Sequence, residues 1–192
     1  MMRLLRCLLL CLGLAALCGR ASAADWWAGL GVHDLNGSAL TVKGRWVVVV
    51  FLSPECPIAN AEVPELNAIA EAYAPKGVTL VGAYADPTLP LASFRQHAAD
   101  YRLRFETADD RTHHLTRAAG ATYTPEVCVF SRAGGILYRG RIDDRASEYG
   151  GTKPQATEQD LREVLDALTA GHPAPFAQKP GFGCSIPDLA RP

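Results

Sequence analysis

The sequence predicts one α/β domain, a three-layer sandwich with a mixed central sheet that follows an N-terminal hairpin. Two apolar runs, 46–52 and 78–84, each precede a stretch with helical periodicity, as in strand–helix units. Two further strands surround Gly134-Gly135, and an amphipathic helix comes last. This alternation, over 192 residues, favours a single layered domain with a sizeable core.

The first elements have clear local signals. Asn36-Gly37 stands between short apolar stretches and indicates the hairpin. The run 46–52 is continuous, β-branched and aromatic, which is typical of a strand buried on both faces. A helix is expected to begin at Pro57, because a residue without an N–H suits the first helical position. Gly77 is expected to end it.

The middle of the chain continues the pattern. We expect a buried strand at 78–84, a helix at 91–101, a short strand at 103–107 and a helix through Ala119. Asp109 or Asp110 is expected to cap the last of these, and His97 is expected to be exposed. His113 and His114 are adjacent, and adjacent helical positions point about 100° apart. They do not form the i, i+4 pair of a helical zinc site, so we expect no metal there.

The final elements follow a turn at Gly134-Gly135. Strands are expected at 126–131 and 136–142, and the charges of 143–145 are expected to be solvated in an exposed loop. Residues 157–160 are expected to cap the last helix, which Gly171 closes. The segment 172–192 contains five prolines, so we expect an extended tail that does not pack.

The N-terminus has the pattern of an export signal. Arg3 and Arg6 precede an apolar run that is short for a membrane span, and Ala21-Ser22-Ala23 fits a cleavage site. A lipidated Cys18 is a weaker alternative. We therefore expect a signal peptide at 1–23, a domain at 24–171 and the tail at 172–192. The mature protein is expected to be secreted or periplasmic, with no stable membrane span.

Cleavage changes both the charge and the cysteine count. Three of the 19 basic residues leave with the leader, so 16 remain against 20 acidic ones, which gives no electrostatic case for binding nucleic acid. Cys56, Cys128 and Cys184 remain, an odd number in an oxidising compartment. Cys128 is expected to be a small core residue. Cys184, on the tail, is either an unpaired thiol or a partner for Cys56.

Cys56 lies where the first buried strand turns into the helix that begins at Pro57. Unpaired amides and the helix dipole favour a thiolate at such a position, and we expect a partly exposed, reactive side chain. The alternative is a buried, inert cysteine. Glu55 is a neighbouring carboxylate that disfavours a second negative charge, so the direction of the pKa shift of Cys56 stays open.

The segment VVVVFLSPECPIANAEVPEL and the later Thr124-Pro125 resemble the thioredoxin-like superfamily, in particular secreted redoxins of the AhpC/TSA and cytochrome-maturation types. The resemblance implies that Pro125 is cis and faces Cys56. It also implies a substrate groove formed by Pro57, Thr124, Pro125 and Ser53. One departure is that Ala59 and Asn60 stand where the CxxC and the copper-binding CxxxC motifs have their second cysteine.

These features predict an exported thiol redox enzyme. Cys56 is the expected nucleophile in thiol-disulfide exchange, resolved by Cys184 or by an outside thiol. The expected partners are protein thiols or disulfides and an external thiol reductant, without a cofactor. Alternatives are reduction of a small peroxide by Cys56, a copper-handling protein of SCO type, and a binding module that keeps only the fold.

Overall fold

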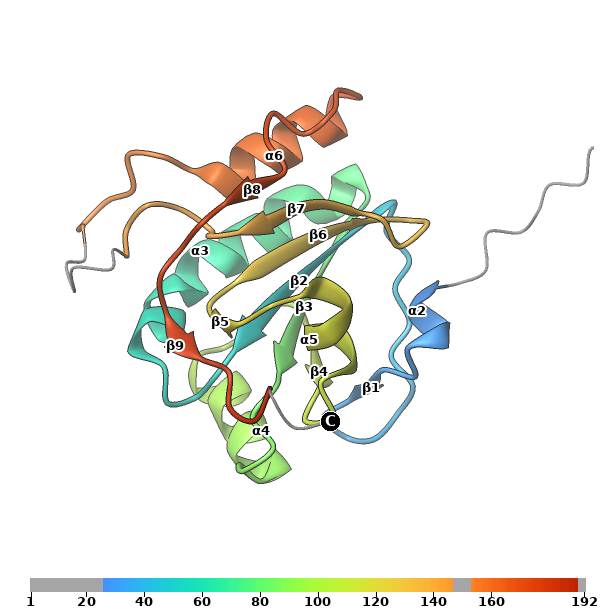
Figure 1. The fold of residues 1–192 in the computed structure, drawn as a ribbon, viewed down its shortest axis with the longest axis vertical. Coiled ribbons are helices and arrows are strands. Elements are labelled where there is room, and N and C mark those ends of the chain that lie inside the picture. The colour runs from blue at the N-terminus through green and yellow to red at the C-terminus, as the bar shows by residue number, and fades with distance from the viewer. Residues whose placement is uncertain (1–25, 147–152, 190–192) are drawn as a thin grey trace, which may run out of the picture.

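The computed structural model describes residues 26–146 and 153–189. The predicted signal peptide, with Cys18, lies outside these ranges. A seven-stranded mixed sheet has the order β1-β4-β3-β2-β6-β7-β8, and β5 and β9 form a separate pair (Figure 1). The strands are β1 (His33–Asp34), β2 (Trp46–Leu52), β3 (Val78–Tyr84), β4 (Glu106–Asp109), β5 (Tyr123–Thr124), β6 (Val127–Ser131), β7 (Ile136–Gly140), β8 (Gln178–Lys179) and β9 (Cys184–Ser185). The helices are α2 (Trp26–Gly29), α3 (Pro57–Tyr73), α4 (Leu91–Asp100), α5 (His114–Ala119) and α6 (Asp160–Thr169), with a 3-10 turn at Ala74–Lys76.

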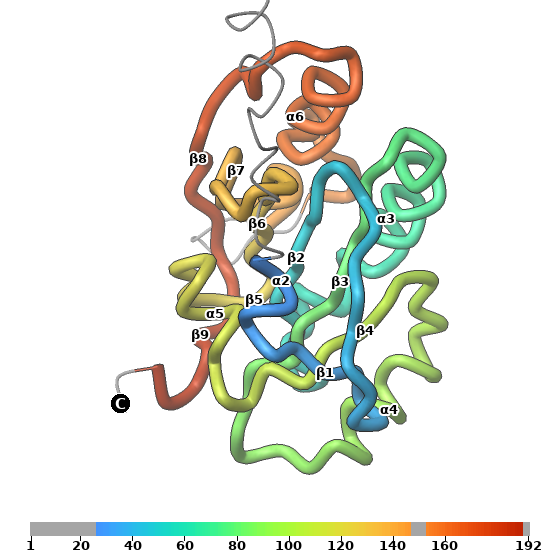
Figure 2. The backbone as a smooth tube through the Cα atoms, turned by 90° about the vertical axis from the view of Figure 1, so that its right-hand side faces the viewer, coloured from blue at the N-terminus to red at the C-terminus, as the bar shows by residue number. Residues whose placement is uncertain are grey.

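Strand β2 is the centre of the sheet, parallel to β3 and antiparallel to β6. All seven of its residues are buried, as its uninterrupted apolar pattern predicts. Val48 and Val50 face a core shared with α3, α4 and α6, whereas Val47 and Val49 face a core shared with α2 and α5. Figure 2 shows α3 and α4 on one side of the strands and α5 on the other. The predicted three-layer sandwich is therefore present.

Some expected elements differ in detail. The N-terminal hairpin is short: His33 and Ala39 form a bridge, and the N–H groups of Asp34 and Leu40 donate to the carbonyls of Ser38 and Val32 at 2.8 and 2.9 Å. On its other side β1 pairs with β4. The strand expected at 103–107 is formed by Glu106–Asp109. Asp110 caps α5 as expected, since its carboxylate accepts hydrogen bonds from the N–H groups of Leu115 and Thr116, both at 2.8 Å.

The start of α6 also differs from expectation. Gln159 occupies the N-cap position and makes no side-chain capping bond. Asp160 is buried instead, and its carboxylate accepts a hydrogen bond from Arg141 at 2.7 Å. The expected cap at 157–160 is therefore wrong. This carboxylate binds a side chain from another element, and it is not available for capping.

The charges at 143–145 are not solvated, contrary to expectation. Asp143 and Asp144 are only 7% and 8% exposed. Arg145 bridges Asp143 and Glu62 of α3, and Lys153 binds Asp144. Carboxylates are kept in buried positions when charged donors compensate for the lost water, and Glu62 lies 83 residues from its donor Arg145.

The expectation that the tail does not pack is wrong. β8 runs parallel to β7, and the N–H groups of Arg139 and Arg141 donate to the carbonyls of Ala177 and Lys179 at 3.0 and 3.1 Å. Farther along, the tail (red in Figure 1) crosses to β5, and Ile186 is 4% exposed. Backbone pairing along the sheet edge thus holds a segment that has no regular apolar pattern.

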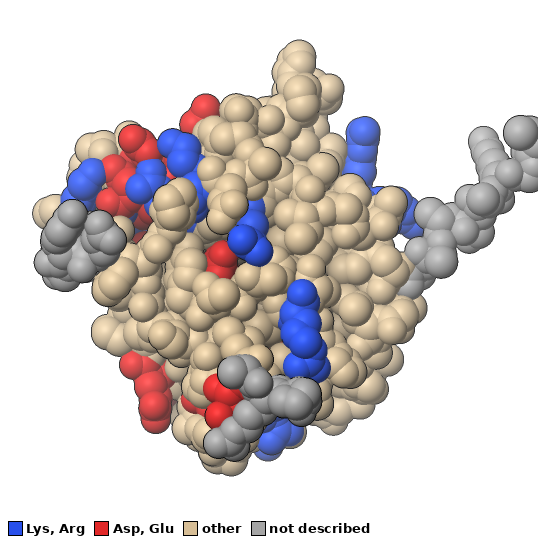
Figure 3. Space-filling view, in the orientation of Figure 1, with Lys and Arg blue, Asp and Glu red and all other residues tan. Residues whose placement is uncertain are grey.

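The surface around β8 is mixed in charge. In Figure 3, basic and acidic side chains gather together over β8 and the start of α6. The ion pairs of this region include Arg141–Glu158 and Lys179–Glu158. Within the described part of the chain, no helix is both long and apolar enough to span a bilayer.

Candidate active site at Cys56 and Cys184

Cys56 occupies the N-cap of α3, and Pro57 is the first helical residue, as predicted. The loop that leaves β2 is closed by a hydrogen bond from the Cys56 N–H to the Ser53 carbonyl at 3.1 Å. The Ser53 hydroxyl accepts a weaker bond from the Glu55 N–H at 3.3 Å. Ser53 therefore shapes the turn through its backbone and hydroxyl, and it forms no hydrogen bond with the Cys56 sulfur.

Cys56 is fully buried, so the expected partial exposure is wrong for this form of the protein. The reason is its partner. Cys56 and Cys184 form a disulfide although 128 residues separate them, and their Cα atoms are 5.9 Å apart, within the usual range of about 4.4–6.8 Å. Cys184 is therefore the partner of Cys56 in this structure and not an unpaired thiol. The tail that carries Cys184 also covers Cys56.

The Thr124-Pro125 peptide is cis, as predicted. It lies against the disulfide, because the Thr124 carbonyl oxygen is 3.2 Å from the Cys56 sulfur. Strand β5 ends at Thr124, which faces Cys184 in the antiparallel pairing with β9. Three segments far apart in sequence, the α3 N-terminus, the cis peptide and the tail, therefore meet at one pair of sulfur atoms.

The glycines beside Cys184 explain how the tail comes so close. A Cβ atom added at Gly183 would lie 2.0 Å from the Thr124 carbonyl oxygen. A Cβ atom added at Gly181 would lie 2.5 Å from the Tyr123 hydroxyl oxygen. Real Cβ atoms essentially never approach other heavy atoms within 3.0 Å. Glycine at positions 181 and 183 thus allows the backbone around Cys184 to pack directly against β5.

Pro125 lines a narrow pocket beside the disulfide together with Ile58, Glu62 and the exposed Phe182. Glu62 is a residue of this site that sequence reasoning missed. It is 4% exposed. Burial and the nearby Asp143 carboxylate raise the pKa of Glu62 to about 7, against the opposing effect of the Arg145 guanidinium. The available signal was a carboxylate on the buried face of α3, between Ala59 and Leu66.

His97 and Asn60 were missed as well. His97 is 5% exposed, contrary to expectation, and it joins Tyr84 to the first turn of α3. Its Nδ1 lies 2.6 Å from the Tyr84 hydroxyl, and its Nε2 lies 2.8 Å from the side-chain Oδ1 of Asn60. Asn60 donates its amide to the Pro54 carbonyl at 3.0 Å. The network braces the loop that precedes Cys56, and burial lowers the pKa of His97.

The proton positions in this network follow from its partners. The amide nitrogen of Asn60 donates to Pro54, so its oxygen faces the ring and accepts from Nε2–H of His97. The other ring nitrogen then accepts from the Tyr84 hydroxyl. A neutral imidazole satisfies both bonds, which agrees with the lowered pKa of His97.

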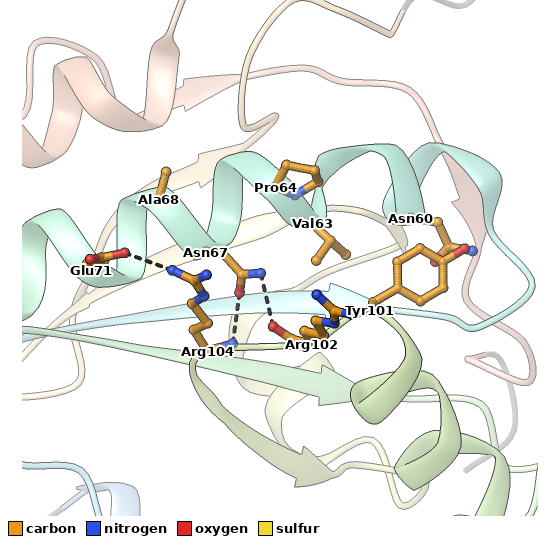
Figure 4. A pocket seen from close by; sticks show the side chains of 9 residues that line it. All are labelled: Asn60, Val63, Pro64, Asn67, Ala68, Glu71, Tyr101, Arg102 and Arg104. Atoms are coloured by element: carbon orange, nitrogen blue, oxygen red, sulfur yellow. Dashed lines mark hydrogen bonds and ion pairs between the residues drawn. The ribbon is translucent and has the colours of Figure 1, made fainter.

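A second groove lies between α3 and the segment after α4 (Figure 4). Asn60 is at one end of it, and Tyr101 and Arg102 line its wall. The side chain of Asn67 holds the two walls together, because it donates to the Arg102 carbonyl at 3.2 Å and accepts from the Arg104 N–H at 2.8 Å. This groove is separate from the pocket beside Pro125.

The described residues contain no cluster of three or more histidine, cysteine or acidic side chains placed to hold a metal. His97 binds Tyr84 and Asn60, and His113 lies 2.6 Å from the Ala85 carbonyl oxygen. His114 lies 3.1 Å from the Leu30 carbonyl oxygen. These histidines are thus engaged elsewhere, and none of them completes a copper site with the two cysteines. Cys128 is free and buried, and burial raises the pKa of its thiol to about 12.

Two solved structures cover most of this fold. An uncharacterised conserved protein from Geobacillus kaustophilus is 29% identical, with a TM-score of 0.72 over 81% of this chain and 86% of that one. A hypothetical protein from Sinorhizobium meliloti is 26% identical, with a TM-score of 0.71 over 81% of this chain and 88% of that one. A secreted disulfide oxidoreductase of Mycobacterium tuberculosis shares the fold at 20% identity, with a TM-score of 0.52 over 74% of this chain and 96% of that one.

Sequence comparison gives a consistent result. The thiol-disulfide oxidoreductase ResA of Bacillus cereus is 23% identical over 141 residues, which cover 72% of this chain and 73% of that protein. The model of the AhpC/TSA family matches residues 31–139, more than half of the chain, and this range includes Cys56 and the cis Thr124-Pro125 peptide. The fold is thioredoxin-like, and the chain belongs to the AhpC/TSA family.

Proposed function

We propose that this protein is a thiol-disulfide oxidoreductase in which Cys56 is the nucleophile and Cys184 is the resolving cysteine. The observation that carries the proposal is the disulfide between these residues at the cis Thr124-Pro125 peptide. The named similarity to ResA, a thiol-disulfide oxidoreductase, supports the same chemistry.

The reaction begins with the reduced protein. The Cys56 thiolate attacks one sulfur of a substrate disulfide, forms a mixed disulfide and displaces the other substrate sulfur as a thiolate. The Cys184 thiolate then attacks the Cys56 sulfur, so the substrate leaves with both sulfurs reduced. The two electrons come from the cysteine pair, which becomes the disulfide seen in the structure. An external thiol reductant restores the dithiol, and the reverse sequence oxidises a substrate dithiol.

The surroundings of Cys56 suit each step. The N-terminal end of α3 places the positive end of the helix dipole at the sulfur that becomes a leaving thiolate. Cys184 reaches that sulfur along the backbone of β5, where Pro125 and Thr124 form the wall. Pro57 fixes the first helical turn without an N–H that needs a partner.

An oxidising compartment fits this proposal. Cys56 and Cys184 are joined by a disulfide, and disulfides form and persist mainly in oxidising compartments. We propose that the leader at 1–23 exports the protein to the periplasm or the medium, where it exchanges disulfides with other proteins.

Membership of the AhpC/TSA family favours a second candidate, reduction of a small peroxide. In that reaction the Cys56 thiolate attacks a peroxide oxygen, an alcohol or water leaves, and the Cys56 sulfenic acid condenses with the Cys184 thiol with loss of water. Among the described residues, no arginine forms a hydrogen bond or ion pair with Cys56. This environment favours disulfide exchange over peroxide reduction.

The test is turnover with both substrates by the reduced protein and three variants. A disulfide-bonded peptide and hydrogen peroxide are supplied separately, with a dithiol as the reductant. Cys56→Ser is expected to abolish disulfide exchange, whereas Cys184→Ser is expected to accumulate a mixed disulfide. Cys128→Ala is the matched control and is expected to keep full turnover, since Cys128 is buried away from the pair. Exchange that survives Cys56→Ser contradicts the proposal, and faster turnover of peroxide than of the peptide selects the second candidate.

A further inference from the structure

The tail is bound to the site as a foreign strand would be. β9 pairs antiparallel with β5, and Cys184 stands opposite Thr124. The pairing continues beyond β9, because the Ile186 N–H donates to the Thr122 carbonyl at 3.1 Å. In the described part of the chain, β5 and β9 form a sheet of two strands, so the edge of β5 has no other strand beside it. When β9 leaves, that edge is left without its partner.

The tail is held differently before and after Pro180. Lys179 is held by backbone pairing with Gly140 and by ion pairs with Glu158 and Asp160 at 3.5 and 3.4 Å. Beyond Pro180 the contacts that hold the tail include the disulfide, the short pairing with β5, the buried Ile186 and the packing of Leu189 against the same core as Ile186. Reduction removes the disulfide, so the segment after Pro180 is then held by noncovalent contacts alone.

We propose that the edge of β5, once the reduced tail has swung away, binds an extended polypeptide in the register of β9. The segment it accepts carries glycine directly before the cysteine that bonds to Cys56, and an aliphatic residue two positions after it. This inference rests on the proposed function and adds the sequence of the partner. Addition of a strand supplies main-chain hydrogen bonds, and the flanking positions supply selectivity.

The glycine requirement comes from Thr124. Any strand that pairs with β5 in this register, with its cysteine opposite Thr124, brings the preceding residue to the place of Gly183. A Cβ atom there would lie 2.0 Å from the Thr124 carbonyl oxygen, which is backbone and cannot rotate away. A larger residue at this position pushes the partner strand away from β5. The cysteine of that strand is then too far from the Cys56 sulfur to bond to it.

The aliphatic requirement comes from the place of Ile186. This side chain is 4% exposed and belongs to the core that contains Phe51 and Ala121. When the tail leaves, this place is open to another apolar side chain. The residue between, Ser185, is exposed, so the same position of the partner is free to vary.

The probe is the tail sequence itself. Reduced protein with Gly183→Ala and Cys184→Ser, otherwise full length, has a free Cys56 and a tail that no longer fits β5. It is mixed with the symmetric disulfide of the peptide Gly-Phe-Gly-Cys-Ser-Ile-Pro-Asp. The Cys56 thiolate attacks one peptide sulfur, the second peptide leaves as a thiolate, and mass spectrometry follows the mixed disulfide. Two analogues replace the glycine before cysteine by alanine, or the isoleucine by serine.

Oxidised glutathione is the reference disulfide without the required sequence. Each peptide's rate of mixed-disulfide formation is divided by the rate with oxidised glutathione. This ratio is expected to be at least about 10-fold higher for the tail peptide than for either analogue. The single variant Cys184→Ser, whose tail still fits, is expected to react more slowly than the double variant with every disulfide. Ile186→Ser combined with Cys184→Ser provides a second way to release the tail if the first double variant does not fold.

The outcomes separate the two proposals. Equal rates for the three peptides, with normal reaction of oxidised glutathione, overturn the partner sequence and leave the oxidoreductase proposal intact. Equal rates for the single and double variants overturn the displacement of the tail. No reaction of Cys56 with any disulfide, in a protein with native circular dichroism, overturns the proposed function itself.

Discussion

Removing the Cys56–Cys184 disulfide is expected to cost the fold a large part of its stability. The bond encloses most of the described domain, because it joins the loop after β2 to the tail and spans 128 residues. Cys184→Ser removes it and leaves a side chain of nearly the same size. Cys56→Ser removes the same bond from the other side, so the two variants and their combination are expected to lose the same stability.

The magnitude follows from the loop length. In the chain-entropy model, closing a loop of 128 residues lowers the entropy of the unfolded chain by an amount worth about 5 kcal/mol at 25 °C. Measured effects are usually smaller than this model gives, so we expect about 3 to 5 kcal/mol. For a domain of this size, a loss of about 1 kcal/mol lowers the melting temperature by roughly 2–4 °C. The expected decrease is therefore at least about 6 °C.

The assay is unfolding by urea, followed by circular dichroism, with and without a dithiol. The free energy of unfolding of the oxidised wild-type protein is expected to fall by the full amount of about 3 to 5 kcal/mol when the dithiol is added. That of Cys184→Ser is expected not to change. Cys128→Ala, which keeps the bond, is the control that must still respond to the dithiol. A loss of less than about 1 kcal/mol in both cysteine variants would refute the reasoning, because the bond would then not be restraining the unfolded chain.

Three further outcomes are expected. The pKa of Glu62 is raised from 4.5 to about 7. The protonated carboxyl therefore stabilises the folded protein fully below pH 4.5, and this stabilisation is lost as the pH rises through 7. Glu62→Gln is expected to flatten the decline in stability from pH 5 to 8, measured as the urea midpoint. A steeper decline in the variant would contradict this sign. Gly183→Ala is expected to slow formation of the disulfide at least about 10-fold in a thiol-trapping time course, whereas Gly29→Ala, where an added Cβ meets no atom within 4 Å, is expected to have no effect. Equal rates for these two variants would show that the tail does not need the close approach. Asn60→Ala is expected to lower the free energy of unfolding by about 1–3 kcal/mol, because His97 loses its partner in a buried site; a loss below about 0.5 kcal/mol would show that the network contributes little.

The parts of the site that sequence predicted have local signals. Cys56 before Pro57 is a strand end followed by a helix start, and both are encoded within a few residues. Thr124-Pro125 precedes a buried strand and follows a helix that ends in glycine. Each signal is short-range, and the fold that places them side by side is one that the apolar runs already indicated.

The parts that sequence did not predict depend on distant partners. The tail packs by backbone pairing at β8 and β9, and such pairing leaves no apolar period in a segment rich in glycine and proline. Arg145 and Glu62 are 83 residues apart, so the burial of their charges is visible only after folding. His97 is on a short helix whose buried face also holds Phe94, and its burial depends on Asn60 of another helix.

The order of events at the two sulfurs tests the central claim most directly. Reduced wild-type protein is mixed with oxidised glutathione, quenched with acid at successive times, and digested for peptide mapping without reductant. The account predicts that glutathione appears first on Cys56 and then disappears as the Cys56–Cys184 disulfide forms, and that it persists on Cys56 in Cys184→Ser. Glutathione that appears first on Cys184, or that persists on Cys56 in the wild-type protein, would contradict the account.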